Sequence, residues 1–230
     1  LLRAPTGSIR RIHATRAGDF GRVRLEAKAH GREEFGRVVV ARDFGEALEA
    51  RLGQLQHLTR CRPARFVGLA GDGNGLRRVR IADADGEREV STRLLVAADG
   101  TRSGVREALG IRAREHDYGQ TLLVARLRTQ RPPDGTAYER LTAHGPTALL
   151  PRGDGHYGLV HGVQSEQAEA VAAMDDAAFL ARVQDAFGWR AGRFLAVGPR
   201  SVYPIIGCVA EALVAPRAVL VGNAAQSLHP

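Results

Sequence analysis

One segment combines a carboxylate, a hydroxyl and a guanidinium just after an apolar run. Asp99 and Gly100 follow the predicted strand 94–97, and Ser103 is placed to cap a short helix that Gly110 ends. An acidic side chain at the end of a buried strand, beside a helix N-terminus, is a usual place for an α/β sheet to bind a ligand. On spacing alone, an ordinary turn aspartate is the simpler explanation of Asp99.

A second segment of similar character lies at the end of the sequence. The predicted strand 217–221 runs into Gly222, and the small residues after it, Asn223 and Ala224 among them, predict the start of a helix. Free backbone N–H groups point outward where a strand passes through glycine into a helix, which suits a phosphate or a ribose. These two segments are therefore the candidates for a binding site.

The elements that must position them predict a mixed α/β (α+β) fold. Short strands are expected within residues 8–25, and a helix is expected to begin at Asp43, with Glu46 completing a capping box and Arg42 just outside it. The glycines between 71 and 75 superficially suggest a dinucleotide-binding loop. Because alternating strand residues follow them, a hairpin is the better interpretation.

The second half of the chain has the pattern of an antiparallel sheet. Gly, Pro and Asp separate short alternating runs, and Asp175 or Asp176 is expected to cap a helix that ends near Gly188. The predicted strands are 64–69, 76–82 and 88–97 in the first half, and 120–129, 137–143, 147–150, 156–163 and 194–206 in the second.

Composition and charge narrow the function classes. The net charge of +8 comes almost wholly from arginine, but the arginines are scattered with little aromatic interleaving, so a nucleic-acid partner is not expected. No apolar run is long enough to span a bilayer. Cys61 and Cys208 lack the spacing of a zinc site or a disulfide framework, which favours reduced cysteines and a cytoplasmic location.

The two candidate segments resemble the motifs of a known family. Asp99-Gly100-Thr101-Arg102-Ser103-Gly104-Val105-Arg106 resembles the D-G-x-x-S-x-x-R signature of the single-component flavoprotein aromatic hydroxylases, which have the p-hydroxybenzoate hydroxylase fold. Residues 222–230 (GNAAQSLHP) resemble the second flavin motif of that family, usually G-D-A-A-H-x-x-x-P. The two motifs stand in the expected order.

The variant residues are similar to one branch of that family. Asn223 in place of Asp, together with Gln226 and His229, is similar to the ubiquinone-biosynthesis branch, in particular to the 2-octaprenyl-6-methoxyphenol hydroxylases. Three further segments are similar to the same branch, namely residues 9–21, 137–140 and 145–151.

The resemblance implies FAD as the cofactor and assigns residues to it. Asp99 would accept hydrogen bonds from the ribose or fix the loop near the pyrophosphate, and Arg106 would neutralise phosphate charge or brace that loop. Arg42 would reach the flavin nucleotide, although a solvated arginine beside a helix explains it too. The FAD-binding residues expected from the resemblance are Arg42, Asp99, Gly100, Ser103, Arg106, Gly222, Asn223, Ala224 and Pro230.

No residue is nominated as a catalytic acid or base, and no metal site is expected. His144, His156 and His161 lie on predicted strands or turns, where an ordinary surface or core histidine is the simpler interpretation. By resemblance the protein is an FAD-dependent monooxygenase, in which NAD(P)H reduces the flavin and O₂ forms a C4a-hydroperoxide that hydroxylates a polyprenylated phenol in ubiquinone biosynthesis. The alternatives are a flavin-dependent reductase or halogenase of the same fold, or a non-catalytic binding fragment.

The resemblance also implies partners and a domain organisation. The expected partners are the phenol, O₂, a ubiquinone-biosynthesis complex and the surface of the bacterial inner membrane, which a basic chain would contact peripherally. Residues 1–111, with 216–230 returning to them, are expected to form part of an FAD-binding domain, and residues 112–215 a substrate-binding domain. The family's N-terminal GxGxxG unit is not in the sequence, so we expect an internal fragment without activity of its own.

Overall fold

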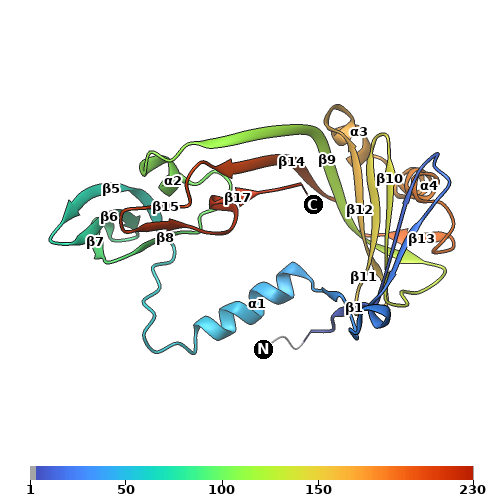
Figure 1. The fold of residues 1–230 in the computed structure, drawn as a ribbon, viewed down its shortest axis with the longest axis horizontal. Helices are drawn as coiled ribbons and strands as arrows, with labels where there is room; N and C mark the ends of the chain where they lie inside the picture. Colours follow the sequence, from blue (N-terminus) through green and yellow to red (C-terminus); the bar gives the residue numbers. More distant parts are fainter. Residues whose placement is uncertain (1–3, 230) are drawn as a thin grey trace. The chain divides into compact units, whose positions relative to one another are not determined.

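The structure is a computed structural model, which describes residues 4–229. The chain divides into two compact units, Leu1–Gln56 with Gly119–Pro204, and His57–Tyr118 with Ile205–Pro230. Figure 1 labels most of the helices and strands of both units. The mixed α/β composition, rich in antiparallel strands, confirms the predicted fold class.

The first unit is built on a sheet with the strand order β9-β12-β11-β10-β2-β3. Neighbouring strands are antiparallel except β10 and β2, which pair in parallel, and a further strand, β13, pairs with β9. The sheet therefore confirms the predicted antiparallel pattern. These strands are β2 (Arg11–Arg16), β3 (Val23–Glu26), β9 (Ala113–Thr129), β10 (Thr136–Thr142), β11 (Gly145–Pro151), β12 (Tyr157–Gln164) and β13 (Phe194–Val197).

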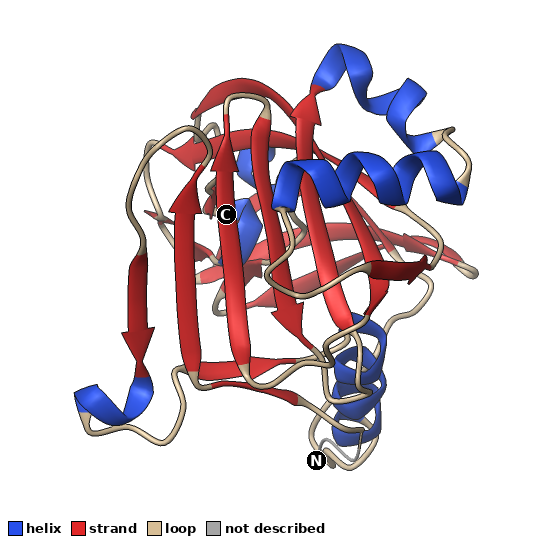
Figure 2. Cartoon of the chain, turned by 90° about the vertical axis from the view of Figure 1, so that its right-hand side faces the viewer, coloured by secondary structure: helices blue, strands red, loops and turns tan. Residues whose placement is uncertain are grey.

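Helices cover one face of this sheet, as Figure 2 shows for α4 (Asp176–Phe187). Asp175 caps α4 by accepting a hydrogen bond from the amide of Ala178, 2.8 Å away, as the sequence predicted. Phe179, Val183 and Phe187 repeat at helical spacing, and all three are buried in the main hydrophobic core, together with apolar side chains of β9, β11 and β12. The neighbouring helical elements are η2 (Ser165–Gln167) and α3 (Ala168–Ala172).

The first helix begins earlier in the chain than the sequence predicted. The helix α1 (Ala41–Leu52) begins two residues before the predicted capping box, with Val40 at its N-cap and no side-chain cap. Asp43 instead forms an ion pair with Arg42. Because the helix begins at Ala41, Arg42 lies inside its first turn and not just outside the helix. The other elements here are β1 (Gly7–Ile9), η1 (Ala27–His30) and β4 (Gly36–Val38), and β1 pairs with β4.

The second unit contains a three-stranded meander, β5 (Arg65–Gly73), β6 (Leu76–Asp83) and β7 (Gly86–Thr92). The glycine-rich turn joins β5 to β6, and Asn74 and Gly75 have φ angles of 52° and 76°, as a tight hairpin requires. The interpretation as a hairpin is therefore confirmed. The predicted strand 88–97 is divided in two, because its last part leaves the meander to pair elsewhere.

That last part, β8 (Leu95–Ala97), runs parallel to β16 (Ala218–Leu220), which brings the two candidate segments side by side. The helix α2 (Gly104–Ala108) follows β8, and a single turn, η3 (Gly222–Ala224), follows β16 where a helix was predicted. The core here combines the small residues Ala97, Ala224 and Ala225 with Val105 and Leu220, all of them buried. The remaining strands are β14 (Ser201–Ala210), β15 (Val214–Ala215) and β17 (Gln226–Ser227).

The boundaries of the two compact units differ from the predicted domains. Residues up to Gln56 belong with the large sheet, because β2 pairs with β10 along its whole length. Residues 57–118 and 205–230 form the other unit. The chain therefore returns to this unit near residue 205, whereas the return was predicted at residue 216. Which unit contacts the flavin and which the substrate stays a prediction.

Candidate functional site

The first motif folds into a closed set of hydrogen bonds around the start of α2. Ser103, the N-cap residue, donates from its hydroxyl to Asp99 Oδ1 and accepts from the amide of Arg106 at 3.0 Å. The other carboxylate oxygen of Asp99 accepts from the amide of Val105 at 3.1 Å. Asp99 and Ser103 therefore cap the helix together, which favours the loop-fixing role expected for Asp99.

These contacts also set the charge state of Asp99. Burial alone would raise the pKa of this carboxyl group, but the hydrogen bonds from Ser103, Val105 and the local backbone outweigh it, so the pKa lies below its usual value. Asp99 is therefore a carboxylate at neutral pH. A carboxylate near the N-terminus of a helix is also stabilised by the free N–H groups there.

Arg106 joins the two motifs. Its side chain is buried, and its guanidinium donates to the carbonyl oxygen of Thr101 and to that of Ala224, each at 2.9 Å. Thr101 belongs to the first motif and Ala224 to the second. Both of these contacts are to the main chain, so of the two roles expected for Arg106, the structure shows the bracing of the loop.

The main chain holds the second motif in place, and the amide side chain of Asn223 is left available for a ligand. Ala224 and Ala225 are buried, whereas Gly222 and Asn223 are exposed. Gly222 has a φ of 58°, a left-handed conformation that favours glycine. Within the described residues, the Asn223 side chain has no hydrogen-bond partner, so both its donor and its acceptor are available. Pro230 lies outside the described residues.

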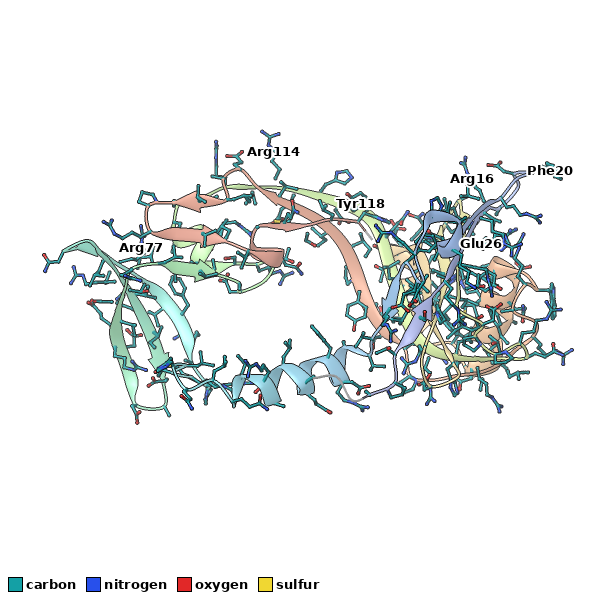
Figure 3. The ribbon with its side chains drawn as sticks, turned by 60° about the horizontal axis from the view of Figure 1, so that its bottom comes forward. Arg16, Phe20, Glu26, Arg77, Arg114 and Tyr118 are labelled. Atoms are coloured by element: carbon teal, nitrogen blue, oxygen red, sulfur yellow. The ribbon has the colours of Figure 1, made fainter. Side chains whose placement is uncertain are left out.

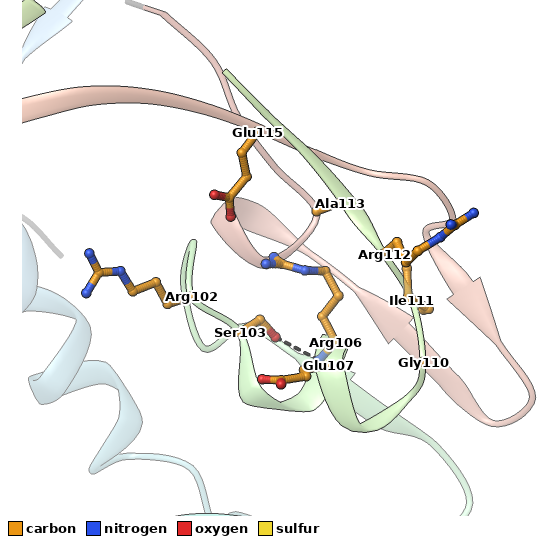
Figure 4. Close-up of a pocket in the computed structure, with 9 residues that line it drawn as sticks. All are labelled: Arg102, Ser103, Arg106, Glu107, Gly110, Ile111, Arg112, Ala113 and Glu115. Carbon is orange, nitrogen blue, oxygen red and sulfur yellow. Dashed lines mark hydrogen bonds between the residues drawn. The ribbon is translucent and has the colours of Figure 1, made fainter. Parts of the chain in front are cut away.

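A hollow of about 440 Å³ lies beside the first motif (Figure 4). Its wall contains Ser103, Arg106 and two further arginines, Arg102 and Arg112, whose side chains point to opposite sides of it. Arg112 pairs with Glu211 at 3.1 Å. Arg102 is exposed and makes no hydrogen bond or ion pair within the described part of the chain. Arg102 was not among the predicted cofactor-binding residues. Its position in the first motif, between Gly100 and Ser103, was a signal in the sequence that could have nominated it.

Arg42 belongs to the other compact unit. Its side chain is 79% exposed and pairs with Asp43 at 3.4 Å and with Glu46 at 3.8 Å. Exposed pairs of this kind are weak, so the guanidinium can exchange them for a phosphate. Arg42 also lines a smaller hollow of about 170 Å³, whose wall includes Arg126 and Arg152, both paired with Asp154. Its contact with a flavin nucleotide stays a prediction.

The residues of the second unit fit a phosphate-bearing dinucleotide such as FAD. The donor set consists of the free guanidinium of Arg102, the open amide of Asn223 and the exposed main chain at Gly222. Cationic and neutral donors next to a strand–glycine–turn segment are the groups that bind pyrophosphate and ribose. Arg106 and the paired carboxylate of Asp99 would hold the loops that carry these donors.

Comparison with known proteins also points to FAD as the cofactor. A family described as FAD binding domain matches residues 7–230. The ubiquinone hydroxylase UbiL of Rhodospirillum rubrum is 36% identical over 204 residues, which are 89% of this chain and 47% of that protein. The chain thus spans about half the length of the curated relatives it matches.

Solved structures agree on the fold. The p-nitrophenol 4-monooxygenase PnpA of Pseudomonas putida DLL-E4 superposes with a TM-score of 0.78 at 14% identity, over 100% of this chain and 59% of that one. The myxobacterial chondrochloren halogenase CndH superposes with a TM-score of 0.74 at 17% identity, over 99% of this chain and 55% of that one. The match over residues 7–230 shows that the chain belongs to the family described as FAD binding domain, and the solved structures share its fold.

Proposed function

We propose that this chain is part of an FAD-dependent monooxygenase that hydroxylates a polyprenylated phenol in ubiquinone biosynthesis. The observation that carries the proposal is the contact between Arg106 and Ala224, which joins the two flavin-type motifs of the sequence. The similarity to a ubiquinone hydroxylase supports the substrate class. NAD(P)H is the proposed electron donor.

The chain's own residues would bind and orient the cofactor. Arg102 would contact a phosphate, and Asn223 would exchange hydrogen bonds with a ribose or ribityl hydroxyl. Asp99 and Ser103 would keep the first loop in place while Arg106 holds the second against it. Bound and reduced, the flavin supplies the activation of O₂ that places one oxygen atom on the phenol ring.

The large sheet of the first unit offers a surface for a greasy substrate. Side chains alternate along β11 and β12 between fully and partly buried, because only one face of the sheet packs on α4. The other face carries Leu150 and Val160 from these strands and Leu141, which is 46% exposed, from β10. By the strand register this face also carries Glu139 and Arg126, and its apolar part suits an aromatic ring with a prenyl chain.

Peripheral contact with an anionic membrane is a further part of the proposal. Among residues 4–229, no helix is long and apolar enough to cross a membrane. The net charge of +8 would attract the chain to acidic lipids, where a polyprenylated phenol dissolves. Sedimentation with anionic vesicles at low salt tests this. If the protein stays in the supernatant with anionic vesicles to the same extent as with neutral vesicles, the electrostatic part is refuted.

FAD binding is the first test of the cofactor assignment. Flavin fluorescence would be titrated with the 230-residue chain and with a chimera, in which residues 7–230 replace the matching segment of the Rhodospirillum rubrum relative. Binding by the chimera that Asp99→Ala weakens would support the proposal. Failure of both proteins to bind, with circular dichroism showing that they are folded, would refute it.

The reaction class needs a separate measurement. With 2-prenylphenol as the probe, a monooxygenase consumes one O₂ for each hydroxylated product and one NAD(P)H. A reductase would consume no O₂ in proportion to product, and a halogenase would require chloride and yield a chlorinated ring. Either of these outcomes in the chimera would replace the proposed reaction while leaving the cofactor assignment intact.

A further inference from the structure

The described end of the second motif packs against an aromatic side chain from a different strand. Tyr118, labelled in Figure 3, lies on β9. Its ring stacks edge to face on two imidazole rings, with ring centroids 4.6 Å from His116 and 4.9 Å from His229. His116 is two residues away on the same strand, so the two side chains share a face. His229 is the last residue of the motif that the structure describes.

The strand between them makes this contact possible. β14 pairs with β17, with Cys208 opposite Ser227, so His229 lies just beyond the strand next to β14. Gly207 is the residue of β14 over which the Tyr118 ring passes. A Cβ atom at Gly207 would lie 3.1 Å from the ring carbon Cε2 and 3.3 Å from the hydroxyl oxygen, closer than a relaxed contact. The missing side chain at 207 therefore leaves room for the ring.

The second motif then has an anchor at each end. At its beginning, Ala224 accepts the hydrogen bond from Arg106. The middle is held by the pairing of β17 with β14 and by the amide of Ala210, which donates to the carbonyl of Ala225 at 2.9 Å. The strand ends at Ser227, and the ring contact between Tyr118 and His229 is placed to hold the motif beyond that point.

We propose that Tyr118 is a positioning residue, which fixes the end of the second flavin motif through His229 and depends on the absence of a side chain at Gly207. The assignment to flavin rests on the function proposed above. All four residues, His116, Tyr118, Gly207 and His229, lie in the same compact unit. Aromatic edge-to-face pairs are stabilising beyond the area they bury, so two of them give the ring a defined place.

Amide hydrogen exchange tests the positioning without any cofactor. Tyr118→Ala should make exchange in residues 226–229 about fivefold to tenfold faster, with exchange in β10–β12 unchanged. Tyr118→Phe keeps the ring and should exchange like the wild type. Tyr203→Ala is the matched control, since this tyrosine is 54% exposed on the same strand as Gly207. Unchanged exchange in Tyr118→Ala would overturn the proposal.

A double-mutant cycle separates positioning from general strand stability. Gly207→Val should displace the ring and speed exchange in the same segment, although valine is a better strand former than glycine. In the Tyr118→Ala background, Gly207→Val should have little further effect, because there is no ring left to displace. Additive effects would overturn the proposal.

FAD titration of the chimera gives the functional readout. Tyr118→Ala should weaken binding about fivefold and shift the visible flavin spectrum, whereas Tyr118→Phe should do neither. If the wild-type chimera binds FAD and Tyr118→Ala binds equally well, Tyr118 has no role in positioning the cofactor. If no chimera binds FAD, the proposed function fails, and the exchange measurement still decides whether Tyr118 holds the segment.

Discussion

The guanidinium of Arg106 donates a hydrogen bond to the carbonyl oxygen of Ala224, 2.9 Å away and 118 residues further along the chain. The same guanidinium also binds the carbonyl of Thr101. A planar fork with several donors can satisfy two carbonyls at once, which a lysine ammonium cannot do with the same geometry. Arg106 is thus a bridge between the two motifs.

Replacing Arg106 should destabilise the second unit. Arg106→Ala leaves two carbonyls without their charged donor, and we expect the free energy of unfolding to fall by about 3 kcal/mol. Arg106→Lys keeps the charge but not the fork, so we expect about half of that loss. Urea unfolding measures both. Arg112→Lys is the control, because Arg112 is 84% exposed and its pair with Glu211 contributes little.

The comparison of alanine with lysine separates bracing from charge neutralisation. If Arg106 acted mainly as a counter-charge for phosphate, Arg106→Lys would keep both stability and FAD affinity. Wild-type stability in Arg106→Lys would therefore contradict the bridging role.

The cap of α2 provides a second prediction. Ser103→Ala removes the acceptor for the Arg106 amide and the donor to Asp99, so we expect a loss of about 1 kcal/mol in the free energy of unfolding. Ser103→Thr keeps both hydrogen bonds and should recover most of the loss. Ser91→Ala, at an exposed position of β7, is the control. Equal stability of the alanine and threonine variants would argue against the cap.

Local patterns predicted much of the fold because the physics behind them is local. Ser103 and Asp175 cap helices as their residue types indicate, and the glycines near residue 74 form a hairpin because the next residues alternate. Asp43 was placed wrongly at an N-cap. A carboxylate can either cap a helix or form an ion pair with an arginine. In this structure Asp43 forms the ion pair, with its neighbour Arg42.

The parts of the site that the sequence could not predict depend on contacts between distant segments. The parallel pairing of β8 with β16 and the bridge from Arg106 to Ala224 require the whole unit to fold. The same is true of Tyr118, whose contact with His229 crosses a third strand. The type of residue at 118 gives no local signal for that contact.

Arg102 provides a third prediction: replacing it should weaken FAD binding and leave the stability of the fold unchanged. Arg102→Gln should change the free energy of unfolding by less than about 0.5 kcal/mol, because the side chain is exposed and unpaired in the described chain. It should weaken FAD binding by the chimera about tenfold, and the difference should shrink at high salt. Arg114→Gln, at an 86% exposed position near Glu211, is the control. Equal FAD affinities for the Arg102 and Arg114 variants would exclude a specific phosphate contact.

His161 provides the last prediction, on pH. Burial, and secondarily the charge of Arg182, lowers the pKa of His161 from 6.5 to about 4, and the ring is 4% exposed beneath Phe179 with its Nδ1 2.9 Å from the hydroxyl of Thr147. The folded protein holds this ring neutral, whereas the unfolded chain protonates it below pH 6.5. The unfolded state therefore binds the extra proton, and stability falls as the pH drops.

The size and the window of this effect depend on the two pKa values. Stability from this group is complete above pH 6.5 and is lost progressively down to about pH 4, by up to about 3 kcal/mol. His161→Gln removes the titration and should flatten the dependence of the unfolding free energy on pH in that window. His144→Gln, at an exposed turn, should retain the wild-type slope. The measurement is urea unfolding at several pH values, and equal slopes for wild type and His161→Gln would show that another group controls the acid sensitivity.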